Sequence, residues 1–432
     1  MKVAVAGLWH LGTVTAACLA SRGHDVIAID EPVVVDRLRQ NLMPVAEPGL
    51  GELAARAEIA GRLAYTTDAA TLAAVGILWV CYDTPVDESD VADTEYVVNR
   101  TLALLPHLAT GALVLISSQL PVGTTARLES HWRRNGCGRE LRFAYSPENL
   151  RLGKAIEVFT NPDRVVVGVR DGRDRDTIAA LLSPFTDRIE WMSVESAEMT
   201  KHALNAFLAT SVTFINDIAA VCEKVGADAE EVERGLKTDV RIGSRAYLHP
   251  GSAFAGGTLA RDVSFLLAIG QEKGAPSHLL SGVRESNAFH KSWLSRRAPE
   301  IVGELAGRRI AILGLAYKPG TDTLRRSGAV EAATWLHRHG VDVSAFDPAI
   351  RALPSDLAPA LSLCGSAAAA LRGADAVLIA TPWPEFRDLS PDLFVREMRQ
   401  PLVFDPGRHL QSAIGADRRI RYFAVGRGDR IP

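Results

Sequence analysis

The sequence lacks paired cysteines, long apolar runs and basic clusters, and each absence excludes a class of protein. No C-x-x-C pair occurs among the five scattered cysteines, Cys18, Cys81, Cys137, Cys222 and Cys364. Neither a disulfide framework nor a zinc site is therefore expected, and we assign no metal ligand. No uninterrupted apolar stretch approaches the roughly 18 residues of a membrane-spanning helix, and the N-terminus does not have the pattern of a signal peptide. We expect a cytoplasmic protein with no membrane partner.

Charge and size narrow the class further. The formal net charge is −3 and no run of Lys and Arg reaches five residues, which argues against a nucleic-acid partner. The hydrophobic fraction of 47% and the charged fraction of 23% are those of an ordinary globular protein. Because 432 residues exceed what one hydrophobic core spans, two or three domains are expected.

The N-terminus has the pattern of a dinucleotide-binding βαβ unit. An apolar run, Lys2–Ala6, precedes the segment Gly7–Gly12, which reads GLWHLG, and an Ala-rich helical stretch follows to Arg22. A second apolar run, Asp25–Ile29, ends at Asp30. In such a unit the pyrophosphate lies at the helix N-terminus and the terminal acid binds the adenosine ribose.

Two residues decide how this unit is interpreted. Asp30 with Glu31 beside it would repel a 2′-phosphate, so NAD is favoured over NADP. Trp9 replaces the middle glycine of the G-x-G-x-x-G pattern, a position that is normally glycine so that the backbone can approach the pyrophosphate. The unit either binds the cofactor or is a structural βαβ that has lost its nucleotide, and its context favours cofactor binding.

Strand-like and helical runs continue to alternate, which predicts a doubly wound parallel sheet. The runs Ile77–Cys81 and Ala112–Ser117 are expected strands. Ligands bind at the loops that follow such strands. Glu148 is the first carboxylate of interest because it stands at an expected strand end, where it is either catalytic or a structural hydrogen-bonding residue.

The segment Glu195–Gly226 predicts one long helix of roughly 45 Å at 1.5 Å per residue. We expect it to cross between domains and to pack against a second copy of itself. Lys201, Asn205 and Asn216 share one face of this helix. Lys201 could extend its amine to solvent, but two amides on the same stripe favour a polar site.

Downstream, the segment Gly251–Asp262 reads GSAFAGGTLARD, a small-residue loop that a ligand can approach closely. A second α/β half follows, with expected strands at Arg308–Leu313, Ala376–Ala380 and Leu402–Phe404. Its loops carry cations that would meet phosphates if they converge and are otherwise ordinary surface charges. They are Lys318, Arg325 and Arg408.

A series of motifs covers nearly the whole chain. They are EPGL at Glu47–Leu50, TP at Thr84–Pro85, PVGT at Pro121–Thr124, SPENLRLG at Ser146–Gly153, NPDRVVVG at Asn161–Gly168, AEMTKHALNAF at Ala197–Phe207, RIG at Arg241–Gly243, GLAYKPGTD at Gly314–Asp322 and the segment Asp405–Arg408. Together they resemble the UDP-glucose/GDP-mannose dehydrogenase family of nucleotide-sugar 6-dehydrogenases.

The resemblance implies an α/β protein with two Rossmann-like doubly wound domains joined by a central helical domain with a long helix. The expected domains are an NAD-binding domain at 1–190, a central dimerisation domain at 191–298 and a nucleotide-sugar (UDP or GDP) domain at 299–432. It also implies NAD as cofactor, a nucleotide-sugar substrate, a homodimer through the central helix and a place in polysaccharide biosynthesis.

In that family the C6 alcohol of a nucleotide sugar is oxidised twice by NAD. A lysine, an asparagine and an aspartate around an ordered water assist the first step, which gives an aldehyde. A cysteine then adds to the aldehyde, and the resulting thioester is hydrolysed with help from a glutamate.

These roles carry over to specific positions. The expected catalytic residues are Lys201, Asn205, Asp262, Glu148 and Thr258. The expected cofactor-binding residues are Gly7, Trp9, Leu11, Gly12, Asp30, Thr84, Pro85, Ser118 and Arg325. The expected substrate-binding residues are Glu148, Leu150, Arg151, Lys201, Asn205, Arg241, Phe254, Gly256, Lys318 and Arg408, with Arg241 reaching in from the partner subunit.

The chain departs from the family at the nucleophile. The family loop reads G-x-G-F-G-G-S-C-F-P-K-D, and its cysteine falls on Thr258. A hydroxyl has a far higher pKa than a thiol and cannot form a thioester, so Thr258 is no simple substitute. Ser118 and Gln119 replace the family's Ser-Thr, and Gly257 replaces the serine before the cysteine.

Three functions remain open from the sequence. The preferred one is an NAD-dependent oxidoreductase that performs one two-electron oxidation, or an oxidation and return, on a nucleotide sugar, with a UDP-hexose favoured. The second is a conventional four-electron dehydrogenase that oxidises the aldehyde hydrate, with Glu148 or Asp262 as base. The third is a non-catalytic paralogue that binds nucleotide sugars.

Overall fold

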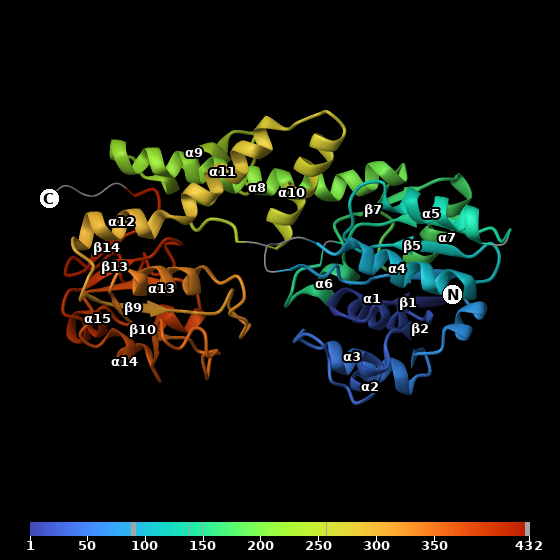
Figure 1. Ribbon diagram of the computed structural model, residues 1–432, viewed down its shortest axis with the longest axis horizontal. Coiled ribbons are helices and arrows are strands. Elements are labelled where there is room, and N and C mark those ends of the chain that lie inside the picture. Colours follow the sequence, from blue (N-terminus) through green and yellow to red (C-terminus); the bar gives the residue numbers. More distant parts are fainter. Residues whose placement is uncertain (88–91, 137, 149, 256, 428–432) are drawn as a thin grey trace. The chain divides into compact units, whose positions relative to one another are not determined.

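The computed structural model describes residues 1–87, 92–136, 138–148, 150–255 and 257–427. Gly256, an expected substrate-binding residue, and Cys137 lie outside the described residues. The chain divides into two compact units, Met1–Leu204 and Asn205–Pro432 (Figure 1).

The first unit is built on an eight-stranded sheet in the order β3-β2-β1-β4-β5-β6-β7-β8. Its strands are β1 Lys2–Ala6, β2 Asp25–Ile29, β3 Leu63–Thr66, β4 Ile77–Val80, β5 Leu113–Ile116, β6 Arg142–Tyr145, β7 Val165–Val169 and β8 Ile189–Met192. Neighbouring strands are parallel except β6 and β7, which pair antiparallel at Ala144 and Val169. The expected strands at Lys2–Ala6 and Asp25–Ile29 are confirmed, and the one antiparallel pair is a departure from the expected parallel pattern.

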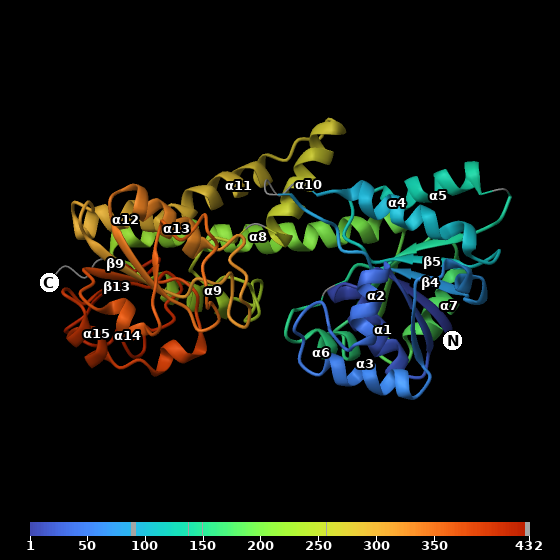
Figure 2. The same ribbon diagram turned by 60° about the horizontal axis from the view of Figure 1, so that its bottom comes forward.

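Helices cover both faces of this sheet (Figure 2). They are α1 His10–Ser21, α2 Pro32–Arg39, α3 Leu50–Ile59, α4 Thr94–Leu104, α5 Thr124–Asn135, α6 Ala155–Thr160 and α7 Gly172–Leu182, with short 3₁₀ segments η1 Ala69–Ala74 and η2 Leu105–His107. Successive β1 residues face opposite sides: Val3 and Val5 pack with α1 and α3, whereas Ala4 and Ala6 pack with α4 and α5. This alternation is what a strand buried on both faces requires.

The second unit carries a parallel six-stranded sheet in the order β11-β10-β9-β12-β13-β14. Its strands are β9 Arg309–Leu313, β10 Asp342–Phe346, β11 Ser362–Leu363, β12 Ala376–Ile379, β13 Leu402–Phe404 and β14 Arg421–Phe423. Both sheets therefore repeat one arrangement, in which the first strand of the unit lies between the second and the fourth. The predicted pair of doubly wound Rossmann-like sheets is confirmed.

The helices of the second unit fall into those that cover the sheet and those that precede it. They are α9 Ala229–Thr238, α10 Thr258–Glu272, α11 His278–Lys291, α12 Trp293–Val302, α13 Gly328–Arg338, α14 Ala367–Leu371 and α15 Pro391–Glu397, with η3 Pro384–Asp388. On one face, Ile310 and Ile312 of β9 pack with α12 and α13. On the other face, Ala311 and Leu313 pack with α14 and α15. Figure 1 shows α12 and α13 on one side of this sheet and α14 and α15 on the other.

The long helix α8, Val194–Val225, confirms the helix expected at Glu195–Gly226. At about 1.5 Å per residue it is about 48 Å long. Among the described helices it is the one long and apolar enough to cross a membrane by length and composition, with 44% of its apolar window buried. The core helix of a soluble protein meets the same criterion.

Candidate functional site

The turn after β1 has the geometry of a dinucleotide-binding turn. Gly7 has a φ of 90°, and a Cβ there would lie 2.5 Å from the backbone nitrogen of Tyr82. A Cβ on Gly12 would lie 1.8 Å from the carbonyl oxygen of Gly7, so only glycine fits either position. Helix α1 begins at His10 with no side-chain cap and no acidic residue in its first turn. Its first N–H groups are suited to an anion.

Trp9 does not distort this turn. The residue is the N-cap of α1, with φ −84° and ψ −152°, a conformation open to any residue. Its side chain is 50% exposed. The indole thus stands at the surface, and the turn keeps its form without the middle glycine.

Asp30 follows β2 and faces the glycine turn. Its Oδ2 accepts the N–H of Leu8 at 2.6 Å. Its Oδ1 accepts the N–H of Glu31 at 2.8 Å and lies 2.6 Å from Nη2 of Arg100. The side chain remains 10% exposed. The glycine turn, the uncapped helix and this acid together fit NAD, which supplies a hydride acceptor when bound.

The second unit has a similar glycine turn after β9, but the acid that faces this turn, Asp347, is buried. Gly314 has a φ of 90°, and Oδ2 of Asp347 accepts the N–H of Leu315 at 2.6 Å. The same oxygen also accepts the indole N–H of Trp383 at 3.0 Å, and Asp347 is 1% exposed. A ribose has no access to Asp347, so the features that fit a dinucleotide belong to the first unit.

Lys201 and Glu148 come together in the first unit. Lys201 lies on α8 and is 5% exposed. Its Nζ donates to the carbonyl oxygen of Glu148 at 2.5 Å and lies 3.4 Å from Glu148 Oε1. Oε2 of Glu148 accepts the N–H of Leu150 at 2.8 Å. The ammonium group of Lys201 is therefore fixed beside the segment that follows β6. Arg151, an expected substrate-binding residue on the same segment, is exposed.

A small cavity lies next to this pair. It has a volume of ≈ 80 Å³ and is lined by Leu11, Glu148 and Leu150 among others. It brings an expected cofactor residue, Leu11, beside expected substrate residues. The cofactor and substrate assignments of these residues stay predictions.

The loops after β4 and β5 are joined by buried hydrogen bonds. Thr84 donates through Oγ1 to the carbonyl of Gln119 at 2.7 Å, and Pro85 follows directly. Within the described part of the chain, Oγ of Ser118 is buried without a hydrogen-bond partner. Glu198 of α8 accepts the N–H of Gly123 at 2.6 Å and so stabilises the start of α5.

In the second unit the loop at Gly251–Asp262 is held in place by buried polar side chains. Asn216 of α8 accepts the N–H of Gly251 at 3.0 Å, and His290 bonds the Gly251 carbonyl at 2.7 Å. Asn287 bonds both the N–H and the carbonyl of Phe254, at 3.0 and 2.9 Å. Burial lowers the pKa of His290, which favours its neutral form. Asn216, expected in a polar site with Lys201, instead anchors this loop.

The loop leads into α10, whose first residue is Thr258. Asp262 lies one turn further along α10, is 0% exposed and accepts a hydrogen bond from Nδ2 of Asn205. Asn205 is four residues after Lys201 on α8. The second unit thus joins Asn205 with Asp262, and the first joins Lys201 with Glu148.

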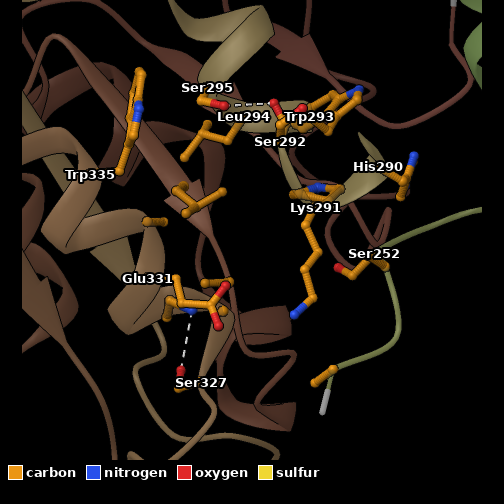
Figure 3. A pocket seen from close by; sticks show the side chains of 18 of the residues that line it. Ser252, His290, Lys291, Ser292, Trp293, Leu294, Ser295, Ser327, Glu331 and Trp335 are labelled. Atoms are coloured by element: carbon orange, nitrogen blue, oxygen red, sulfur yellow. Dashed lines mark hydrogen bonds between the residues drawn. The ribbon is translucent and has the colours of Figure 1, made fainter. Parts of the chain in front are cut away.

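A cavity of ≈ 470 Å³ opens at the carboxyl ends of β9 and β12. This is where the strand order of the second sheet reverses, the usual ligand position in such sheets. Figure 3 shows Lys291 and Glu331 on different walls, with Trp335 further along. Arg326 also lines it. The sequence patterns did not point to these residues, because none of them lies within the motifs.

The other expected substrate cations are placed differently. Arg408 is 7% exposed, with Nη1 2.6 Å from Asp228 Oδ1 and Nη2 donating to the carbonyl of Val425 at 2.9 Å. Arg241 is exposed, and its guanidinium donates hydrogen bonds to both carboxylate oxygens of Asp239. The guanidinium of Arg408 is thus engaged within the protein, while that of Arg241 is accessible at the surface.

Lys318 and Arg325 lie in the segment between β9 and α13. Lys318 is partly buried and Arg325 is exposed. Neither lines the 470 Å³ cavity. Their assignments to diphosphate and cofactor stay predictions.

Three of the four described cysteines are buried thiols with raised pKa values. Burial raises the pKa of Cys18 to about 12, and burial also raises the pKa of Cys81 and of Cys222. Cys364 follows the edge strand β11, and its Sγ contacts the carbonyl of Ser362. Raised pKa values keep a thiol in its unreactive protonated form.

Comparisons with known proteins cover the whole chain. Three family models of the UDP-glucose/GDP-mannose dehydrogenase family match: the NAD binding domain at residues 1–186, the central domain at 195–289 and the UDP binding domain at 311–412. UDP-glucose 6-dehydrogenase of Pseudomonas aeruginosa is 36% identical over 444 positions, covering 99% of this chain and 98% of that protein. UDP-glucose 6-dehydrogenase of Rhizobium meliloti is 34% identical, with 99% and 100% covered.

Two solved structures agree with these relatives. A UDP-glucose dehydrogenase from Pyrobaculum islandicum matches with a TM-score of 0.88 and 30% identity, covering 99% of this chain and 98% of that one. A UDP-D-ManNAc dehydrogenase from Pyrococcus horikoshii matches with a TM-score of 0.85 and 25% identity, covering 99% and 100%. The chain therefore belongs to the UDP-glucose/GDP-mannose dehydrogenase family of NAD-dependent nucleotide-sugar dehydrogenases.

Proposed function

We propose that this enzyme removes one pair of electrons from an alcohol of a UDP-hexose and releases a product at the aldehyde level. The proposal rests on Thr258, the first residue of α10, to which the resemblance to the family assigns the position of the catalytic cysteine. In the family mechanism the second oxidation proceeds through a covalent thiol adduct of the aldehyde, a tetrahedral species that can donate a second hydride.

The three buried cysteines, Cys18, Cys81 and Cys222, do not support a thiol route. Cys81 is fully buried, and its raised pKa disfavours the thiolate. A threonine hydroxyl has a far higher pKa than a thiol and needs an adjacent base to become nucleophilic. We therefore expect one NADH for each sugar, whereas direct oxidation of the aldehyde hydrate would give two.

The first oxidation needs a group that accepts the hydroxyl proton and a group that stabilises the developing alkoxide. We assign the proton to Asp262, whose carboxylate is oriented by Asn205. We assign alkoxide stabilisation to the Lys201 ammonium, which is held by Glu148. NAD, when bound, would supply the hydride acceptor for the carbon-bound hydrogen, while the Asp262 carboxylate would take the hydroxyl proton and an aldehyde would remain.

Helix α8 carries both Lys201 and Asn205. Lys201 and Asn205 are four residues apart on one continuous helix, so their side chains emerge on the same face. Lys201 is paired with Glu148, and Asn205 is paired with Asp262.

The nucleotide is proposed to bind in the second unit. The 470 Å³ cavity at the switch point of its sheet has a tryptophan on its wall and the cations Lys291 and Arg326 among its lining residues. These suit an aromatic base and a diphosphate. The UDP binding domain match and the UDP-glucose relatives support uridine as the base.

We also propose a homodimer through α8. Phe207, Phe214 and Val221 are spaced by seven residues and are 70%, 47% and 58% exposed. Residues at this spacing form one helix stripe, the pattern by which helices pair. A second copy over this stripe would cover these exposed apolar side chains of α8. The three family matches support the proposed division at 1–190, 191–298 and 299–432.

A panel of nucleotide sugars incubated with NAD tests this function. NADH formation identifies the substrate, and mass spectrometry of the product identifies its oxidation level. We expect a UDP-hexose to be the best substrate and to lose two hydrogens. A uronate as the main product would contradict the proposal, and binding of UDP-sugars without any NADH would favour a non-catalytic role.

A further inference from the structure

Arg100 is held between the two carboxylates that follow β2 and two aromatic rings. Its Nη2 lies 2.6 Å from Asp30 Oδ1, and its Nη1 pairs with Glu31. Its guanidinium carbon lies 5.1 Å from the ring centroid of Tyr82 and 5.7 Å from that of Tyr96. Because the side chain is 23% exposed, this is a positioned guanidinium that still reaches the surface.

The contacts of Asp30 limit what a ribose can gain from it. A carboxylate offers roughly four acceptor positions. Three are used by the N–H of Leu8, the N–H of Glu31 and the guanidinium of Arg100. Asp30 therefore retains about one position, on Oδ2, instead of the two that a ribose diol would use.

Arg100 also changes the charge at this end of the site. Asp30 and Glu31 alone would present two negative charges to a 2′-phosphate and exclude it. The guanidinium reduces this to one net negative charge. Glu31 is 56% exposed, so its carboxylate can turn to solvent and release Nη1 of Arg100 to another anion.

We propose that Arg100 sets the cofactor selectivity and allows the site to bind NADP as well as NAD. The inference rests on the proposed placement of the adenosine ribose at Asp30. An arginine beside the ribose accommodates a 2′-phosphate, since its fork of N–H donors matches phosphate oxygens. The rings of Tyr82 and Tyr96 hold that fork in position.

Calorimetric titration of the full-length protein with NAD and with NADP tests the proposal without relying on turnover. We expect both dinucleotides to bind to the wild type. Arg100→Gln should weaken NADP binding by about tenfold or more, because a unit charge near a dianion is lost, and should change NAD binding by less than about threefold. Glu31→Gln should strengthen NADP binding. Arg100→Lys, which keeps the charge, should retain most of the NADP affinity.

Controls separate the possible failures. Arg62→Gln removes a surface ion pair with Asp25, 2.6 Å in length, and should leave both affinities unchanged. If NADP fails to bind the wild type, or Arg100→Gln weakens both cofactors alike, the inference is wrong. If Asp30→Asn leaves NAD binding unchanged, the proposed ribose position itself fails.

Discussion

Replacing Asn216 by alanine tests whether buried side chains fix the loop that leads to Thr258. Asn216 is 1% exposed, and its Oδ1 accepts the N–H of Gly251 at 3.0 Å. The substitution leaves that buried N–H without an acceptor, which costs about 2 kcal/mol. The 3.5 Å contact of Nδ2 with the Ser252 carbonyl adds little. For a domain of this size the melting temperature should fall by about 4–8 °C.

The same substitution should lower kcat, because the released loop carries Thr258 and leads to Asp262. A displacement of about 1 Å at reacting groups costs up to a hundredfold, so a loss of about tenfold is expected. Calorimetric melting and steady-state kinetics measure the two effects. Asn135→Ala, which removes an exposed amide on α5, is the matched control. A variant at Asn216 that melts within about 1 °C of wild type with unchanged kcat would refute the reasoning.

Two further predictions concern His290 and α8. Burial lowers the pKa of His290 from its ordinary value of 6.5, so its contribution to stability is complete above that value and is lost as pH falls toward the folded-state pKa. The melting temperature should therefore decrease less between about pH 7.5 and about pH 5.5 in His290→Gln than in the wild type. In the exposed control His131→Gln the decrease should equal that of the wild type. Phe214→Asp should convert the dimer to monomer in light scattering, whereas Asp at the exposed position Val240 should not; a dimeric Phe214→Asp protein would contradict the α8 interface.

The sequence predicts the fold well where local pattern decides it. The runs that form β1 and β2 and the unbroken helical period of α8 need only nearby residues. The antiparallel pairing of β6 with β7 was not expected. Pairing direction depends on where the intervening chain packs, which no local pattern records. The two-residue strand β11 was missed because it is too short to show a period.

The site was predictable in part, for an equally physical reason. Helical spacing predicts that Asn216 shares a face of α8 with Lys201. It does not indicate what Asn216 contacts, which is a loop 35 residues away. Arg100 was missed because it reaches Asp30 from 70 residues along the chain. The roles given to Lys201 and Asp262 came from resemblance to the family, and the structure adds their partners.

The ratio of NADH formed to sugar consumed tests the central claim most directly. With limiting UDP-hexose and excess NAD, the wild-type enzyme should give one NADH per sugar and an aldehyde-level product. Thr258→Cys places a thiol at the start of α10, where the helix N-terminus favours the thiolate, and should raise the ratio toward two. A wild-type ratio of two with a uronate product would contradict the account.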